Sequence, residues 1–196
     1  MTEQAYITCR NLTKTYFKGK TEITPLSDLN LDVVRGDFLA LMGPSGSGKT
    51  TFLNMVGGLD SPTEGDIIID GINIGDLKSS QLTDFRMRNI GFVFQAYNLI
   101  PVLTAKENVE FIMLLQNEDK EKMNARTVEL FKAVGLEGKE NNKPSELSGG
   151  QQQRVAVARA LASKPKFVLA DEPTANLDSH STENLLDIMY KLNQEE

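Results

Sequence analysis

Two kinds of apolar stretch divide the chain into predicted strands. Residues 5–9 and 26–34 alternate between apolar and polar side chains, which is typical of strands with one buried face. Continuous apolar runs at 38–42, 90–94 and 167–170 are typical of short strands that are buried on both faces. A further short strand is predicted at 67–69, with a turn after it at Asp70-Gly71.

Start and stop signals place the helices between these strands. Thr104 with Glu107, and Ser148 with Gln151, have the spacing of capping boxes, and Gly135 is a helix stop. Asp178 or Ser179 is predicted to cap the last helix. The predicted helices are 49–56, 79–89, 104–115, 124–134, 148–163 and 179–193.

The order of these elements predicts a mainly parallel α/β sheet, because strands alternate with helices. Residues 96–155 lack strand patterns, and we expect them to form an inserted helical subdomain. Hairpin-like strands near the N-terminus predict a separate β flap. The predicted division is a core of residues 1–95 and 156–196 with this flap, and a helical subdomain at 96–155.

Composition narrows the possible functions. The chain has 196 residues and a formal net charge of -6, which argues against a general nucleic-acid or anionic-lipid binder. Single residues, Cys9 and His180, leave no room for an internal disulfide, a zinc cluster or a conventional serine-protease triad. We expect Cys9 to be a buried strand residue. No apolar run is of bilayer length and no signal-peptide pattern is present, so we expect a cytoplasmic protein that reaches membranes through a partner.

The most specific motif is GPSGSGKT at residues 43–50, which fits G-x-x-x-x-G-K-[ST] between a predicted strand and a helix. Its glycines let backbone N–H groups point inward, and the helix dipole aids anion binding. Lys49 is predicted to reach the β- and γ-phosphates, and the Thr50 hydroxyl to bind Mg²⁺. The predicted nucleotide contacts are Gly43, Pro44, Ser45, Gly46, Ser47, Gly48, Lys49, Thr50 and Thr51.

Two acids follow the apolar run at 167–170. Ligands of open α/β sheets lie at the carboxyl ends of strands, so Asp171 is placed to hold Mg²⁺ through water. Glu172 is placed to accept a proton from an attacking water. Solvated acids are also common at strand ends, and the phosphate loop makes the catalytic interpretation the stronger one.

A second helix start resembles half of a phosphate site. Ser148, Gly149, Gly150 and Gln151 combine a hydroxyl, two glycines and a helix N-terminus, without a lysine. One complete and one partial site suggest that the partial site serves another copy, reciprocally in a two-fold dimer. The alternative is an ordinary capping box.

Together these residues resemble the ATP-binding cassette (ABC) family, closest to the lipoprotein-release and macrolide-export type. Residues 43–50 resemble its Walker A loop, 147–151 its signature motif and 167–172 Walker B with the catalytic glutamate. Gln95 resembles the Q-loop glutamine, and 176–178 the D-loop. In addition, Tyr16 resembles the aromatic residue that stacks on adenine.

The resemblance implies an α/β fold: a P-loop NTPase (RecA-like) core with an antiparallel β subdomain and an inserted helical subdomain. It implies ATP and Mg²⁺, the metal being served by Thr50, Gln95 and Asp171. Glu172, Gln95 and Lys49 are then the catalytic residues. Ser148, Gly149, Gly150 and Gln151 act in trans in an ATP-bound homodimer.

The same resemblance implies an integral membrane permease as partner, and no nucleic acid. The chain is then peripheral at the inner face of the cell membrane. Residues 96–101 would face the permease, with Tyr97 and Leu99 either contacting it or belonging to the core. Such a subunit drives the permease by ATP-dependent dimerisation.

One feature departs from the family, which carries a further strand ending in a histidine that senses the γ-phosphate. Here residues 194–196 end the chain, and we expect His180 to be a solvated surface residue. A chain that ends early, a disrupted gene or a regulatory relic would explain this, and we favour the first. We then expect weak ATP binding and poor hydrolysis; steady hydrolysis that depends on Glu172 would refute this.

Two other functions compete with a transporter ATPase. A soluble cassette ATPase acting on nucleic acid or ribosomes is weakened by the acidic balance and the single cassette. A small-molecule phosphotransferase would use the same loop but leaves Gln95 and the Ser148 helix start unexplained.

Overall fold

The computed structural model describes residues 5–195, with the side chains of His180 and Glu195 outside the described part. The chain forms two compact units, one ending at Asp84 and one beginning at Phe85, and each is considered by itself. The expectation that His180 has a solvated side chain therefore lies outside the described residues. The predicted domain boundaries at 95 and 155 stay a prediction.

The first unit is built on an antiparallel sheet with strand order β2-β1-β3-β4. The β1–β2 pair is a long hairpin, with Ile7 opposite Val33 and Lys18 opposite Thr21. Both strands are longer than the sequence predicts, because pairing continues past bulges into polar residues. The bounds are β1 Ile7–Lys18, β2 Thr21–Val33, β3 Glu64–Ile69 and β4 Ile72–Asn73.

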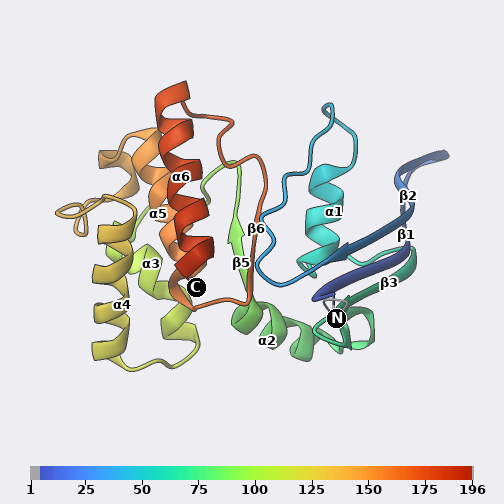
Figure 1. Ribbon diagram of the computed structural model, residues 1–196, viewed down its shortest axis with the longest axis horizontal. Coiled ribbons are helices and arrows are strands. Elements are labelled where there is room, and N and C mark those ends of the chain that lie inside the picture. The colour runs from blue at the N-terminus through green and yellow to red at the C-terminus, as the bar shows by residue number, and fades with distance from the viewer. Residues whose placement is uncertain (1–4, 196) are drawn as a thin grey trace. The chain divides into compact units, whose positions relative to one another are not determined.

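Helix α1 (Lys49–Val56) begins and ends where its pattern predicts, and Met55 and Val56 are buried. The buried side chains of β1 and β3 include Cys9, as expected, and Ile67. A short 3₁₀ turn, η1 (Ile74–Asp76), follows β4. Figure 1 shows α1 directly after the loop that carries residues 43–48.

The strand predicted at 38–42 is wrong in this structure. The segment has no strand pairing among the described residues, and Phe38, Leu39, Leu41 and Met42 are exposed, Met42 to 93%. A strand is defined by its ladder to a neighbour. The antiparallel sheet of this unit contributes no such neighbour to the segment.

The second unit contains a parallel pair of strands, β5 (Ile90–Val93) and β6 (Phe167–Ala170), in the register Ile90 opposite Phe167. This confirms the parallel pairing of these two runs. Helices α3 (Ala105–Leu115), α4 (Lys120–Ala133) and α5 (Gly149–Ala162) follow β5 in the chain, with the 3₁₀ turn Pro144–Glu146 before α5. Helix α2 (Ser79–Asn89) leads into β5, and α6 (Ser179–Glu195) follows β6.

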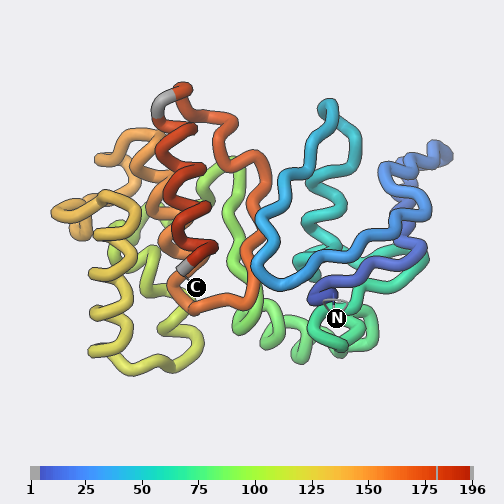
Figure 2. Tube along the Cα trace, viewed as in Figure 1, coloured from blue at the N-terminus to red at the C-terminus, as the bar shows by residue number. Residues whose placement is uncertain are grey.

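The helix starts follow their local chemistry. The capping boxes at Thr104 and Ser148 are both present, as predicted. By contrast, α4 begins at Lys120 rather than 124, because the Asp119 side chain accepts from the backbone N–H groups of the first turn. Asp178 caps α6, accepting from the Ser181 backbone N–H at 2.9 Å. Figure 2 follows the chain from β6 through this turn into α6.

The core of the helical part joins α3, α4 and α5. Its members are apolar residues with almost no exposed surface, including Val109, Leu130, Phe131, Val155 and Ala158. A second cluster packs α5 and α6 against the strands through Val93, Val157 and Leu185. These clusters hold the start of α5 close to the loop after β6.

Candidate functional site

The phosphate loop, residues 43–48, has the backbone that its glycines allow. Gly46 and Gly48 adopt φ of +80° and +89°, which side-chain-bearing residues rarely take. A Cβ on Gly48 would lie 2.6 Å from the Pro25 carbonyl oxygen. Gly48 immediately precedes α1, so no side chain caps the helix, and the described helix has no acidic residue in its first turn. The positive helix end is therefore left for an anion.

The Lys49 ammonium folds over this loop. Its Nζ donates to the carbonyl oxygens of Gly43 at 2.9 Å and Pro44 at 3.1 Å. A lysine held over a turn of backbone amides places a positive charge where phosphate oxygens would bind. Thr50 and Thr51 follow in the first turn of α1, as the motif predicts.

Tyr16 lies in the same unit with a polar network around it. Its hydroxyl donates to Asp60 Oδ2 at 2.7 Å, and Lys14 Nζ lies 4.9 Å from the ring centroid. Lys14 Nζ also pairs with Asp60 Oδ1 at 2.7 Å. Tyr16 as a residue is 40% exposed, so part of its surface is open to a planar ligand.

The two acidic groups of this network respond to their surroundings. Burial, followed by the hydrogen bond to Asp60, raises the pKa of the Tyr16 hydroxyl. Burial acts to raise the pKa of the Asp60 carboxyl, but hydrogen bonds from Lys14 and then Tyr16 outweigh it and lower that pKa. Asp60 is therefore a firmly ionised anchor for the tyrosine and the lysine.

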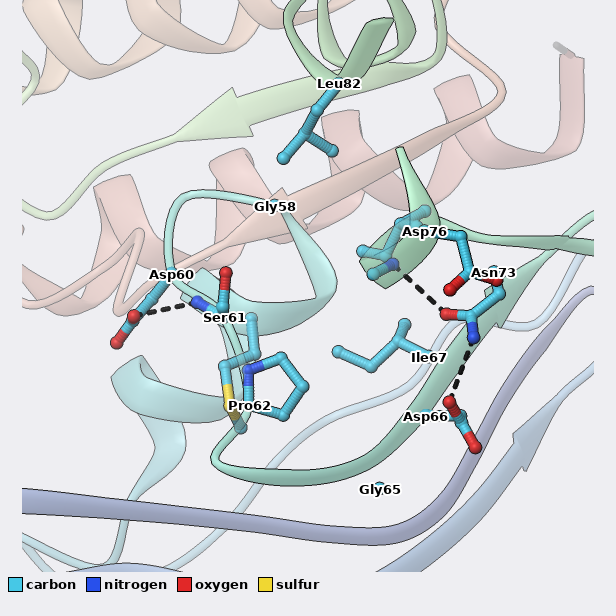
Figure 3. A pocket seen from close by; sticks show the side chains of 13 residues that line it. Gly58, Asp60, Ser61, Pro62, Gly65, Asp66, Ile67, Asn73, Asp76 and Leu82 are labelled. Carbon is cyan, nitrogen blue, oxygen red and sulfur yellow. Dashed lines mark hydrogen bonds between the residues drawn. The ribbon is translucent and has the colours of Figure 1, made fainter. Parts of the chain in front are cut away.

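A hollow of about 230 Å³ lies beside this network, between the end of α1, β3 and η1. Figure 3 shows that two carboxylates lining it are hydrogen-bonded: Asp60 accepts from the Ser61 backbone N–H and Asp66 accepts from Asn73 Nδ2. Apart from Asp60, the hollow contains no residue of the phosphate loop or the Tyr16 network. It is not the predicted nucleotide site.

In the second unit, Gln95, Glu172 and Asn176 are joined by hydrogen bonds beyond the carboxyl ends of β5 and β6. Gln95 Nε2 donates to Glu172 Oε2 at 2.9 Å, although the residues are 77 apart in the chain. Asn176 Nδ2 donates to the Gln95 carbonyl oxygen at 3.1 Å. The Asp171 backbone N–H continues the strand ladder to Val93, so its side chain starts from a fixed strand end.

Backbone strain marks the same place. Glu172 has φ +43°, and Tyr97 and Asn98 have +54° and +50°. Left-handed conformations of such residues cost on the order of 1 kcal/mol or more each and persist where the surroundings hold them. Here Arg159 of α5 donates to the Tyr97 carbonyl oxygen at 2.8 Å and to that of Asn98. Burial lowers the pKa of the Arg159 guanidinium.

At the predicted partial site, the start of α5, Ser148 is exposed and Gly149 and Gly150 are half-buried. The Ser148 side chain accepts from the Gln151 backbone N–H at 3.3 Å, and Gln151 Oε1 accepts from the Ser148 N–H at 2.9 Å. A Cβ on Gly149 would lie 3.0 Å from Tyr97 Oη. Both hydrogen bonds of the capping box are therefore formed. Gly149, in the same first turn, borders Tyr97 in the segment after Gln95.

The structure therefore groups the predicted residues by unit. Tyr16 and the phosphate loop belong to the first, while Gln95, Asp171, Glu172 and the start of α5 belong to the second. Sequence reasoning missed Lys14, Asp60 and Arg159. An arginine within the apolar stretch 155–162 was a signal, because a charge in a buried helix face needs partners.

Another missed residue is Asn108, which is fully buried in α3. Its Oδ1 accepts from the Ile100 backbone N–H at 2.7 Å, and its Nδ2 donates to three carbonyl oxygens of residues 100–104. Arg159 and Asn108 together hold the segment that follows Gln95. Leu99 in this segment packs against the helical core.

Comparison with known proteins decides the family. The family described as ABC transporter matches residues 26–175, which span the phosphate loop, Gln95, the start of α5 and the two strand-end acids. This chain belongs to the ABC transporter family.

Curated relatives agree with this assignment. The cassette is 49% identical over 194 residues to the uncharacterized ABC transporter ATP-binding protein MJ0796 of Methanocaldococcus jannaschii, covering 97% of this chain and 83% of that protein. It is 47% identical over 189 residues to YvrO of Bacillus subtilis, covering 96% of this chain and 82% of that protein. The macrolide export ATP-binding/permease protein MacB of Mannheimia succiniciproducens is also 47% identical, over 96% of this chain but only 29% of MacB.

Solved structures show the same fold. A dimer of MJ0796 in a post-hydrolysis state with ADP and Pi has a TM-score of 0.89 and 48% identity, covering 96% of this chain and 83% of that one. A second dimeric MJ0796 structure gives the same TM-score at 49% identity. The predicted P-loop NTPase fold and the resemblance to the macrolide-export type are confirmed.

The cassette is therefore an ATP-binding and ATP-hydrolysing subunit of the ABC transporter class. The nucleic-acid or ribosome alternative finds no support among these relatives. In the described part of the chain, no helix is long and apolar enough to cross a bilayer.

Proposed function

We propose that two copies of this cassette bind ATP between them and hydrolyse it to drive a membrane permease. The observation that carries the catalytic part is the 2.9 Å hydrogen bond between Gln95 and Glu172. It joins a predicted metal ligand to the predicted general base, at the strand ends where α/β proteins bind ligands.

ATP binding is assigned to the first unit. The amides of residues 43–48 and the Lys49 ammonium hold the phosphates, with Thr50 and Thr51 in the first helical turn beside them. Tyr16 stacks on the adenine through the open part of its ring, while Asp60 and Lys14 keep that ring in place.

The oxygen donors fit Mg²⁺. The Thr50 hydroxyl, the Asp171 carboxylate and the Gln95 amide oxygen are the hard ligands that this ion prefers, together with phosphate oxygens. Gln95 donates its amide nitrogen to Glu172, which leaves the amide oxygen for a metal. When bound, Mg²⁺ neutralises charge that develops on the phosphates.

Hydrolysis is assigned to Glu172. Its carboxylate orients a water and accepts a proton as the water oxygen bonds to the γ-phosphorus and the bond to ADP breaks. The hydrogen bond from Gln95 holds one carboxylate oxygen of Glu172, and the other oxygen is proposed to accept the proton. The strained backbone of Glu172 fits a position held for function rather than for folding.

The dimer is assigned to the start of α5. Ser148, Gly149, Gly150 and Gln151 present a hydroxyl and a helix N-terminus to the γ-phosphate held by the other copy. The support is that one chain carries a complete and a partial phosphate site, and that both solved structures of the relative MJ0796 are dimeric. A two-fold axis then completes both sites at once.

The permease contact is assigned to residues 96–101. Arg159 donates to the Tyr97 carbonyl oxygen and Asn108 accepts from the Ile100 backbone N–H, so both fix the backbone of this segment directly after Gln95. One relative joins an ATP-binding part and a permease in its name. The cassette then acts at the cytoplasmic face of a membrane through that partner.

The test replaces the proposed base while keeping the shape of the site. Glu172→Gln retains hydrogen bonding to Gln95 but cannot take up a proton. This variant should not hydrolyse ATP, so ATP stays bound. With millimolar ATP and Mg²⁺, we therefore expect light scattering to show a dimer. A variant that stays monomeric under saturating ATP would contradict the proposal.

A further inference from the structure

One buried polar side chain has no role in the fold described above. Gln153 of α5 is fully buried, yet neither its Oε1 nor its Nε2 has a hydrogen-bond partner among the described residues. Its neighbours along the helix, residues 155–158, are apolar. An unpaired buried amide is costly, and an apolar side chain of similar length would avoid that cost.

The position of Gln153 points to the start of the same helix. It is one turn after Gly149 and Gly150, and residues three and four apart share a helix face. Helical side chains lean toward the N-terminus of their helix, so the Gln153 amide extends over the two glycines. That face borders Tyr97 and Asn176, since a Cβ on Gly149 would lie 3.0 Å from Tyr97 Oη and 4.0 Å from the Asn176 carbonyl oxygen.

The segments on this face carry the catalytic residues. Asn176 holds the Gln95 carbonyl oxygen, and Gln95 in turn holds the Glu172 carboxylate. Tyr97 and Glu172 have left-handed backbone conformations, with φ +54° and +43°, which store strain. The segments around Tyr97 and Asn176 therefore lie beside the helix face that Gln153 shares with Gly149.

We propose that Gln153 is a positioning residue for hydrolysis. Its amide is unpaired in the arrangement seen here and pairs with the segments around Tyr97 and Asn176 in the arrangement that ATP binding favours. Each hydrogen bond gained there shifts the population toward that arrangement. Gln95 and Glu172 are then held in place by the start of α5, which contacts the other copy's nucleotide. This inference rests on the proposed function.

The test exchanges the amide for a thioether of similar length. Gln153→Met removes the unpaired polar atoms, so we expect a higher melting temperature in the absence of nucleotide. We also expect kcat for ATP hydrolysis to fall about tenfold, because methionine cannot form the hydrogen bonds that the Gln153 amide is proposed to make in the active arrangement. KM for ATP should change less than about twofold, because the ATP-binding loop is not altered. If Gln153 only filled space, its replacement by methionine would not both raise the melting temperature and lower kcat.

Thr127→Val is the matched control. Thr127 is also buried, but its hydroxyl already donates to the Met123 carbonyl oxygen at 2.8 Å within α4. This change should lower the melting temperature and leave kcat unaltered, because it deletes a satisfied hydrogen bond outside the catalytic segments.

Three results would overturn the inference. A lower melting temperature of Gln153→Met would mean that the amide is already satisfied, for example by an internal water. An unchanged kcat of Gln153→Met would mean that the Gln153 amide does not position the catalytic residues. If the unaltered protein does not hydrolyse ATP, the proposed function fails and this inference fails with it; if the unaltered protein hydrolyses ATP and Gln153→Met hydrolyses it equally well, only this inference fails.

Discussion

The substitution Gly150→Ala should distinguish a structural role of the α5 start from a functional one, because its effects on stability and on ATP-driven association are expected to be opposite. Gly150 is the second residue of α5, and a Cβ there would lie 3.6 Å from Ser181 Oγ and 3.8 Å from Leu177 Cδ2. Both are ordinary contact distances, so the fold accepts alanine. Replacing glycine by alanine within a helix gains up to about 1 kcal/mol, and in this first turn about half of that. For a chain of this length, the melting temperature of Gly150→Ala should rise by about 1–2 °C.

The same methyl group should damage ATP-driven association. It projects from the turn whose N–H groups are proposed to meet the γ-phosphate of the other copy. Loss of one hydrogen bond to a charged group costs about 1.5–3 kcal/mol, which is tenfold or more in affinity. The assay is the dimerisation constant at saturating ATP, measured by analytical ultracentrifugation in a Glu172→Gln background.

Ser80→Ala is the control, because Ser80 is an exposed residue that, like Gly150, is the second residue of its helix, here α2. It should stabilise the protein slightly and leave association unchanged. If Gly150→Ala dimerises with ATP as well as its parent does, the start of α5 is only a helix cap and the reasoning is refuted.

Two further predictions concern the first unit. Asp60→Asn should lower the free energy of unfolding near pH 7 by about 1 kcal/mol. The pKa of Asp60 is lowered in the folded state. The stabilisation from its carboxylate is therefore complete above the unfolded pKa of about 3.9, and it is lost as the pH falls through the folded pKa. Urea unfolding from pH 7 to 3 should therefore show the gap between variant and parent closing at acid pH, and a constant gap would count against the Lys14–Asp60–Tyr16 network. Gly48→Ala should cost more stability than Gly36→Ala, because φ is similar at +89° and +83° but only at Gly48 would the new Cβ meet a carbonyl oxygen, at 2.6 Å. Equal melting temperatures for the two variants would show that this close approach is unimportant.

Local signals predicted the local structure well. The bounds of α1, α2 and β6 match their patterns, and both capping boxes are present, because each depends on neighbouring residues alone. The start of α4 was missed because its first turn is polar, so apolar periodicity does not show it and only the Asp119 cap does. The run at 38–42 failed for the opposite reason: apolar composition does not by itself supply a strand neighbour.

The chemistry of the site was predictable in its residues but not in its contacts. The phosphate loop and the strand-end acids were visible because a fixed spacing carries their chemistry. The hydrogen bond between Gln95 and Glu172 crosses 77 residues and emerges only from the β5–β6 register. Arg159 and Asn108 act on backbone carbonyl oxygens, which have no sequence signature.

The central claim is that each nucleotide is held by the phosphate loop of one copy and the α5 start of the other, and mixing two defective variants tests it most directly. Lys49→Met disables the loop and Ser148→Arg blocks the helix start, each in a Glu172→Gln background that retains ATP. A mixed dimer keeps one intact site, whereas neither variant alone keeps any. With fluorescent labels on the two variants, we predict ATP-dependent energy transfer in the mixture and no ATP-dependent association of either variant alone. Absence of transfer in the mixture, while the unmixed Glu172→Gln parent dimerises, would contradict the account.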